Sequence, residues 1–231
     1  MKKLTLILFV TLFTIIAFAQ KPNYKVFPFK SGIIEYEYAG KTKGTHIKYI
    51  DDYGYKQADE TNSVTKILGQ KTIENSTDIL IGSVIYSIDY KDNTLIKVKN
   101  PVYETYANAS GDYEELGKQA MDVLGFKNTG ETGTVLGKEC EIWKGPLGEV
   151  WVWKNLALKT KTKILGIKIE ETAVNINLNS SIPSGKFEVP SNLEVQEMDD
   201  MVGGQSAESD EPTVEDVKNT IKSLFGKKSR N

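Results

Sequence analysis

Few side chains in this sequence have the types and spacing that catalysis needs. Nucleophilic catalysis by a serine or cysteine usually needs a general base, and His46 is the only histidine in the chain. His46 alternates with Ile47 and Tyr49 in a strand-like stretch. This alternation predicts an exposed histidine on the polar face of a strand, so no catalytic base is indicated.

The single cysteine also lacks the surroundings of a reactive thiol. Cys140 lies between Glu139 and Glu141, whose negative charges would raise the pKa of the thiol. A buried structural cysteine is the favoured interpretation, and a reactive or partner-linking thiol is the alternative. One histidine and one cysteine far apart in sequence do not form a recognisable zinc site. We therefore expect no metal, no cofactor and no enzymatic activity.

Aromatic and aliphatic residues at alternating strand positions are the strongest candidates for a binding surface. The candidate ligand-binding residues are Ile34, Tyr36, Tyr38, Ile47, Tyr49, Tyr86, Tyr90, Trp151 and Trp153. A curved sheet would gather them on one apolar face. That face is either an ordinary core under a helix, or a concave site for an amphipathic ligand such as an acyl lipid or a sugar.

The elements that would position these residues are mostly strands. Period-two alternation predicts strands around 34–38, 45–49, 66–74, 79–90, 94–99, 135–144, 149–154, 156–161, 166–178 and 185–189, with a bulge near Glu171. One internal helix is predicted over residues 113–124 from its apolar stripe. Residues 65–71 and 162–168 differ at one position in seven, a short echo compatible with a duplicated strand module.

The first nineteen residues predict a secretory signal peptide. Met1-Lys2-Lys3 precede an apolar run from Leu4 to Ile16, and Ala17-Phe18-Ala19 provide small residues for cleavage near Ala19. No second apolar run follows, so we expect no transmembrane anchor in the mature chain and a periplasmic or secreted location. Without Lys2 and Lys3, 27 basic residues face 31 acidic ones. This balance argues against nucleic acid and against electrostatic docking on an anionic membrane.

The composition changes near residue 195. We expect a curved β-sheet domain over residues 20–194, an acidic flexible linker over 195–212 and an amphipathic helix over 213–226. The apolar stripe of that helix, a candidate partner-binding surface, consists of Val214, Val217, Ile221, Leu224 and Phe225. The predicted fold class is mainly β (α+β): a strongly curved antiparallel sheet or incomplete β-barrel with one internal helix and this C-terminal helix.

A tryptophan-rich pattern resembles one known group of proteins. It runs through Glu139–Lys144, Gly148–Lys154 and Leu156–Lys159 and ends at Phe187-Glu188-Val189-Pro190. It is similar to secreted, uncharacterised bacterial proteins of the Bacteroidetes type, related to the periplasmic carriers of outer-membrane lipoproteins. The resemblance implies an incomplete antiparallel barrel with helices closing its open side and an apolar concavity for acyl chains.

Three hypotheses follow. The first is a non-enzymatic periplasmic binding or carrier protein that holds a lipid or other amphipath on the aromatic face of the sheet. The second is a cell-envelope interaction module that uses the acidic linker and the C-terminal helix. The third, an enzyme that uses carboxylates or Cys140, has the least support because no acid–base constellation is legible in the sequence.

Overall fold

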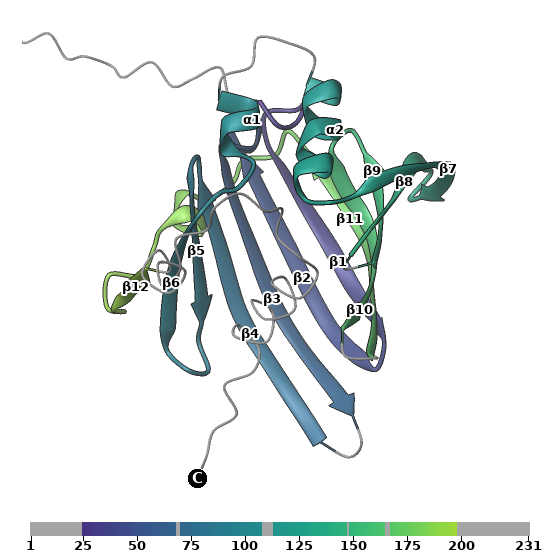
Figure 1. The fold of residues 1–231 in the computed structure, drawn as a ribbon. Helices are drawn as coiled ribbons and strands as arrows, with labels where there is room; N and C mark the ends of the chain where they lie inside the picture. The colour runs from purple at the N-terminus through teal and green to yellow at the C-terminus, as the bar shows by residue number, and fades with distance from the viewer. Residues whose placement is uncertain (1–24, 68–69, 108–112, 147, 165–166, 198–231) are drawn as a thin grey trace, which may run out of the picture.

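The fold is a single open β-sheet with two short helices (Figure 1). The structure, a computed structural model, describes residues 25–67, 70–107, 113–146, 148–164 and 167–197. Its strands are β1 (Gly32–Gly40), β2 (Thr42–Asp51), β3 (Lys56–Ile67), β4 (Gln70–Ile81), β5 (Val84–Asp89), β6 (Thr94–Lys99), β7 (Lys127–Val135), β8 (Lys138–Gly145), β9 (Gly148–Trp153), β10 (Leu156–Ile164), β11 (Ile167–Leu178) and β12 (Val195–Glu197). The helices are α1 (Tyr103–Ala107) and α2 (Tyr113–Val123), with 3-10 turns at Asp52–Gly54 (η1) and Ser184–Phe187 (η2).

The strand order explains how the chain builds a curved sheet without closing it. The twelve strands follow the order β12-β6-β5-β4-β3-β2-β1-β11-β10-β9-β8-β7, so β12 and β7 are the two edges. Neighbouring strands pair antiparallel except β12 and β6, which are parallel. The prediction of a mainly β fold with a strongly curved, incomplete barrel is confirmed.

The two helices lie at one end of the sheet, and several hairpin turns lie at the other (Figure 1). Gly40, at the end of β1, pairs with Ile169 near the start of β11. Lys66 and Lys71 pair across the β3–β4 hairpin. The paired strand ends of the β1–β2, β3–β4 and β10–β11 hairpins therefore lie at the same end of the sheet, away from α1 and α2.

Helix α2 packs closely on the turn between β9 and β10. A Cβ added at Gly117 would lie 2.0 Å from Oδ1 of Asn155, so only glycine fits at this crossing. The amide of Asn155 donates to the carbonyl oxygens of Val26 (2.8 Å) and Tyr113 (2.6 Å). The predicted helix at 113–124 is confirmed, whereas the five-residue α1 was not predicted.

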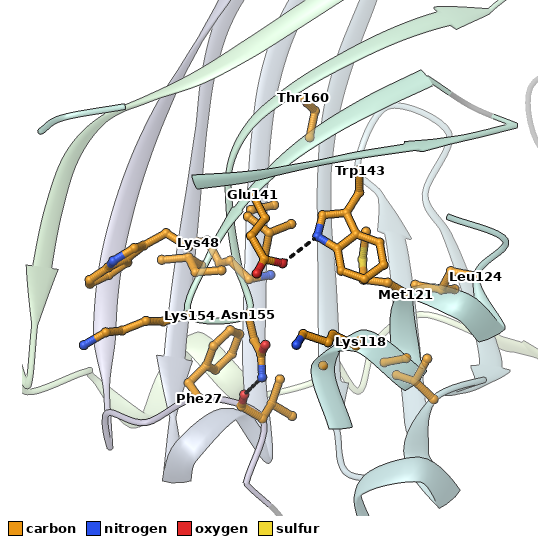
Figure 2. A pocket seen from close by; sticks show the side chains of 18 of the residues that line it. Phe27, Lys48, Lys118, Met121, Leu124, Glu141, Trp143, Lys154, Asn155 and Thr160 are labelled. Carbon is orange, nitrogen blue, oxygen red and sulfur yellow. Dashed lines mark hydrogen bonds between the residues drawn. The ribbon is translucent and has the colours of Figure 1, made fainter. Parts of the chain in front are cut away.

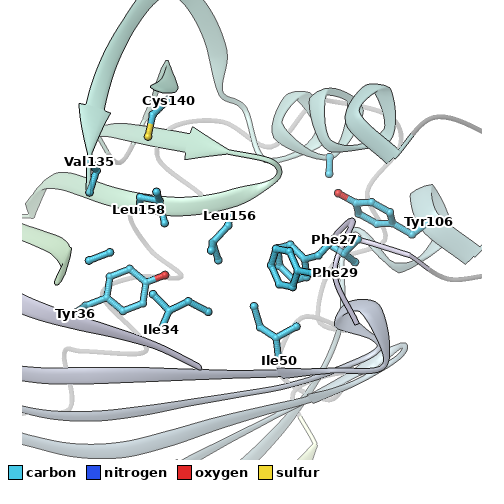
Figure 3. Close-up of a cluster of buried hydrophobic side chains, with 13 residues drawn as sticks. Phe27, Phe29, Ile34, Tyr36, Ile50, Tyr106, Val135, Cys140, Leu156 and Leu158 are labelled. Carbon is cyan, nitrogen blue, oxygen red and sulfur yellow. The ribbon is translucent and has the colours of Figure 1, made fainter. Parts of the chain in front are cut away.

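Two hydrophobic cores cover the two faces of the central strands. The face toward the helices, called here the inner face, carries Ile34, Tyr36 and Ile50, which pack with Phe27 and Tyr106 (Figure 3). The opposite, outer face carries Tyr49, Ala58 and Ile79, which pack with Phe187 of η2. The segment from Ile182 to Leu193 thus crosses the outer face and covers it.

Some predicted strand limits are wrong. Residues 66–74 are the two arms of the β3–β4 hairpin, and the predicted strand at 79–90 is divided at Gly82, whose φ of +56° places it in the left-handed region. The predicted strand at 185–189 overlaps the 3-10 turn η2 instead. The predicted bulge in the long strand is confirmed, because the register shifts where Glu35 pairs with Asn175 and Tyr36 with Ala173.

Several predicted segments lie outside the described residues. These are the signal peptide at 1–19, the linker beyond residue 197, and the helix at 213–226 with its five candidate partner-binding residues. Val195–Glu197, assigned to the linker by composition, form the short edge strand β12. Within the described part of the chain, no helix is long and apolar enough to span a bilayer.

Candidate functional site

A cavity of about 560 Å³ lies between α2, the inner face of the sheet and strands β8 and β9 (Figure 2). Its apolar lining includes Phe27, Met121, Leu124, Trp143, Trp153 and Leu156. Met121 and Leu124 come from α2 and its C-terminal end, and the small residues Gly117 and Ala120 of α2 also face the space. The helix therefore forms one wall of the cavity.

The tryptophan wall is held by polar groups at its edges. Trp143 is only 4% exposed, and its indole Nε1 donates to Oε2 of Glu141 at 3.2 Å (Figure 2). The Nζ atoms of Lys138 and Lys154 lie 4.2 Å and 5.2 Å from the ring centroid of Trp153. These contacts hold both rings in place, with lysine ammonium groups over the ring of Trp153.

Three side chains of the cavity floor, those of His46, Lys48 and Glu171, form a charged network with Asp59 on neighbouring strands. His46 Nδ1 lies 2.5 Å from Oε1 of Glu171, and its Nε2 lies 2.7 Å from Oδ1 of Asp59. Lys48 Nζ completes the network at 2.8 Å from Oδ2 of Asp59. His46 and Lys48 belong to β2, Asp59 to β3 and Glu171 to β11, so the network crosses β1 and braces the middle of the sheet.

The electrostatics of this network keep His46 positively charged. Burial favours the neutral ring, but hydrogen bonds and charges from Asp59 and Glu171 outweigh burial and raise the pKa of His46 to about 9. Burial likewise opposes ionisation of Asp59, but Lys48 and His46 lower its pKa to about 2. At neutral pH the network therefore contains two cations and two anions.

Tyr36 separates this network from the apolar core. Its ring stacks on the imidazole of His46 with centroids 4.7 Å apart and an interplanar angle of 10°. Its hydroxyl donates to the carbonyl oxygen of Ala157 at 2.8 Å. Burial, followed by the charges of Asp59 and Glu171, raises the pKa of Tyr36 well above its usual value, so the phenol remains a neutral donor.

This arrangement limits what His46 can do chemically. A general base needs a free ring nitrogen near a substrate, whereas both nitrogens of His46 contact carboxylates. The prediction that His46 is exposed is wrong: its side chain is 14% exposed. His46 does face the side opposite to Ile47 and Tyr49, but that side is the cavity floor and not bulk solvent.

The nine predicted ligand-binding residues do not share one surface. Ile34, Tyr36, Trp151 and Trp153 belong to the inner core, and of the nine only Tyr36 and Trp153 line the cavity. Tyr38 follows Tyr36 on the same face of β1, where burial, followed by the charge of Glu171, raises the pKa of its phenol.

The remaining four candidates lie elsewhere. Ile47, Tyr49 and Tyr86 pack in the outer core, and Tyr90 is 43% exposed after β5. Alternation relates residues within a strand, but the register between strands decides which faces coincide. Ile47 pairs with Glu35, and Tyr49 pairs with Ile33, so neither shares a face with Tyr36.

Sequence reasoning missed most of the cavity lining. Asp59 and Glu171 were not linked to His46, because they lie 13 and 125 residues away and only strand pairing brings them together. Met121 and Trp143 were likewise not selected. The position of Met121 on the predicted helix, one residue from Ala120 in the apolar stripe, was the one available signal for its role.

Cys140 is buried, as predicted. It is fully enclosed in the inner core, and burial raises the pKa of its thiol. The physical cause differs from the one expected, since burial and not the neighbouring glutamates is responsible. Among the described residues, no group of three or more His, Cys, Asp or Glu side chains is arranged to hold a metal ion.

Comparison with known proteins gives only distant similarities. No protein-family model matches the sequence, and no curated protein matches it. An uncharacterized conserved protein from Thermus thermophilus aligns with 74% of this chain and 91% of its own length, at 8% identity and a TM-score of 0.45. PNGF-II aligns with 73% of this chain and 31% of its own length, at 14% identity and a TM-score of 0.38.

MucB, solved in complex with MucA(peri), aligns with 72% of this chain and 56% of its own length, at 11% identity and a TM-score of 0.35. MucB is thus a distant structural neighbour. None of these similarities is close enough to assign an activity, a ligand or a partner to this chain.

Proposed function

We propose that this protein is a non-enzymatic binding or carrier protein that holds an amphipathic small molecule in the cavity beneath α2. The observation that supports the proposal best is the cavity itself. It combines aromatic and aliphatic walls with a charged floor that is already internally paired. Such a site accepts an apolar body and also offers polar contacts for a head group.

The volume suits a small ligand. About 560 Å³ falls within the range of roughly 300–1,000 Å³ that is usual for small-molecule sites. The apolar lining of Phe27, Met121 and Trp143 favours acyl or ring systems over sugars with many hydroxyl groups. A purely apolar hydrocarbon is disfavoured, because it would displace water from the charged side chains of His46 and Lys48 on the floor without a polar group to replace it.

The surroundings of His46 and Cys140 support a binding role over catalysis by either of these two side chains. Both nitrogens of His46 contact carboxylates, and the thiol of Cys140 is enclosed in the core. A periplasmic location follows from the predicted signal peptide. The alternative of an interaction module remains a prediction, because the segment at 213–226 lies outside the described residues.

The first test is native mass spectrometry, with organic extraction, of the protein isolated from the periplasm of its own host. A bound mass in the range of a lipid or similar amphipath would support the proposal and identify the ligand class. A protein free of ligand that also takes up no hydrophobic dye would contradict it. In that case, capture of a partner that is lost on deletion of residues 197–231 would favour the interaction module.

A variant pair tests the location of the site. Met121 is half-buried and lines the cavity, so Met121→Trp should fill part of the volume and reduce dye or lipid uptake at least about fivefold. Gln119→Trp adds the same side chain at an exposed position of α2 and serves as the control. Equal binding by both variants, at unchanged melting temperatures, would place the ligand elsewhere.

A further inference from the structure

The hairpin end of the sheet carries a row of exposed lysines that the proposed function does not use. This row, called here the lysine rim, consists of Lys41, Lys43, Lys66, Lys71, Lys163 and Lys168. All six side chains are exposed, and among the residues that the structure describes none of the six forms an ion pair with a carboxylate. The rim stands out because the whole chain has a net charge of −2.

The sheet order makes the rim continuous. The β3–β4, β1–β2 and β10–β11 hairpins are adjacent in the sheet, and their paired strand ends lie at the same end of it (Figure 1). The backbone N–H of Lys66 donates to the carbonyl oxygen of Lys41 at 3.1 Å, which joins the first two turns. Gly40 of β1 pairs with Ile169 of β11, directly after Lys168, which joins the β1–β2 hairpin to the β10–β11 hairpin. Six strands at about 4.8 Å spacing give a row roughly 25 Å wide.

The two similar segments, residues 65–71 and 162–168, occupy corresponding places in two hairpins. Each copy forms the end of a hairpin, and in each a lysine pairs directly with another lysine across the two strands: Lys66 with Lys71, and Lys163 with Lys168. Like charges at directly opposite positions destabilise a sheet. The same unfavourable pair occurs twice at one end of the molecule, which indicates a role that offsets the cost.

A groove of about 530 Å³ extends the positive charge toward β8 and β9. It is lined by Lys144, Lys161, Lys163 and Lys168 together with Glu149 and Glu170. Lys161 Nζ lies 3.2 Å from Glu149, and Lys159 Nζ lies 2.5 Å from Glu170, so lysines already neutralise both carboxylates. The positive charge of Lys163 and Lys168 is therefore not cancelled within the groove.

From this geometry we propose that the lysine rim docks the protein, hairpin end first, on a membrane surface that contains anionic phospholipids. A row of exposed lysines along the end of a sheet contacts a flat surface at many points at once, whereas a linear polyanion is held better by a groove with stacking aromatic rings. Lysine ammonium groups are compact point charges that suit a diffuse negative surface. Ile73, which is 48% exposed two residues beyond Lys71, adds an aliphatic contact at the interface.

The net negative charge of the chain does not oppose this docking. Salt screens charges that lie more than roughly 10 Å away, so the surface responds to the local rim and not to the chain total. The expectation from composition that the protein avoids anionic membranes considered the total charge alone. Docking through the rim directs α1 and α2 away from the membrane and is independent of the cavity proposal.

Vesicle co-sedimentation tests the inference, with the protein as isolated from the cells that export it. We expect binding to vesicles of about 70% phosphatidylcholine and 30% phosphatidylglycerol in roughly 0.1 M salt, and its loss in about 0.5 M salt. Vesicles of pure phosphatidylcholine should bind at least about tenfold less, and they also measure any contribution from the N-terminal apolar run.

A matched pair of triple variants assigns the effect to the rim. Lys66→Gln, Lys163→Gln and Lys168→Gln together should weaken binding to the anionic vesicles at least about tenfold. The control replaces Lys25, Lys30 and Lys127, which are exposed lysines outside the rim, with the same change in net charge. Equal weakening by both triple variants would overturn the proposal, as would a protein that binds heparin or polyphosphate through the rim but not the vesicles.

Discussion

The inner and outer faces of the central sheet are both covered, but their chemistry differs. On the outer face Tyr49, Ile79 and Phe187 make an apolar layer. On the inner face His46, Asp59 and Glu171 form a buried charge network beside a cavity. A polar position within a strand therefore need not face bulk solvent. The outer face carries a partly exposed ion pair, between Lys186 and Glu60, whereas the inner face combines a cavity with a network of four charged side chains.

The largest effect is expected on the outer face. Phe187 is 8% exposed and is the main side chain through which the segment after β11 covers this face. Phe187→Ala should lower the free energy of unfolding by about 3–5 kcal/mol, measured by urea denaturation. A loss below about 1 kcal/mol would mean that this segment contributes little to the outer core, and the contrast between the faces would weaken.

A smaller effect is expected on the inner face, from the charge network. His46→Ala leaves the carboxylates of Asp59 and Glu171 without their shared cation, which should cost roughly 2–3 kcal/mol. This cost is below that for a fully buried pair because the side chains of His46 and Asp59 are 14% and 25% exposed. Lys127→Ala is the control, since it breaks an exposed pair with Asp122 and should cost less than about 1 kcal/mol. Similar losses in both variants would argue against a special role for the network.

The smallest effect is a pH dependence specific to the inner face. The pKa of His46 is raised from 6.5 to about 9 in the folded protein. The contribution of His46 to the free energy of unfolding is therefore fully present below pH 6.5 and is lost as the pH rises through about 9. Stability should fall by roughly 2 kcal/mol over this window in the native protein, but not in His46→Ala. An imidazole pKa near 6.5 by NMR, with a flat stability profile, would contradict the network as described.

The sequence predicted the class of fold better than its details. Alternation around Tyr36 and the apolar stripe of α2 were sufficient for a curved sheet with an internal helix. The strand β3 was missed because its inner-face positions Gln57, Asp59 and Thr61 are polar, so the expected contrast between faces is absent. The division at Gly82 was missed because aliphatic residues continue on both sides of the turn.

The candidate site was less accessible from the sequence. Of the predicted ligand-binding residues, Tyr36 and Trp153 line the cavity and pack in the inner core, because alternation identifies buried positions within a strand. The charge network was missed because it depends on pairing between distant strands, and no local pattern encodes the distance from His46 to Glu171. The lysine rim was missed for a similar reason. The net charge of the whole chain does not show which lysines lie together in the folded sheet.

The central position of β1 has a consequence for how the chain folds. Hairpins such as β3–β4 and β8–β9 form between neighbouring segments, whereas β1 must pair with β11, where Gly32 meets Leu178. Closing so long a loop costs entropy before its contacts form, and sheets rich in distant pairings fold slowly. The pairing of β1 with β11 therefore forms only once Leu178 is available, and until then strands β1–β6 cannot join strands β7–β11 in one sheet.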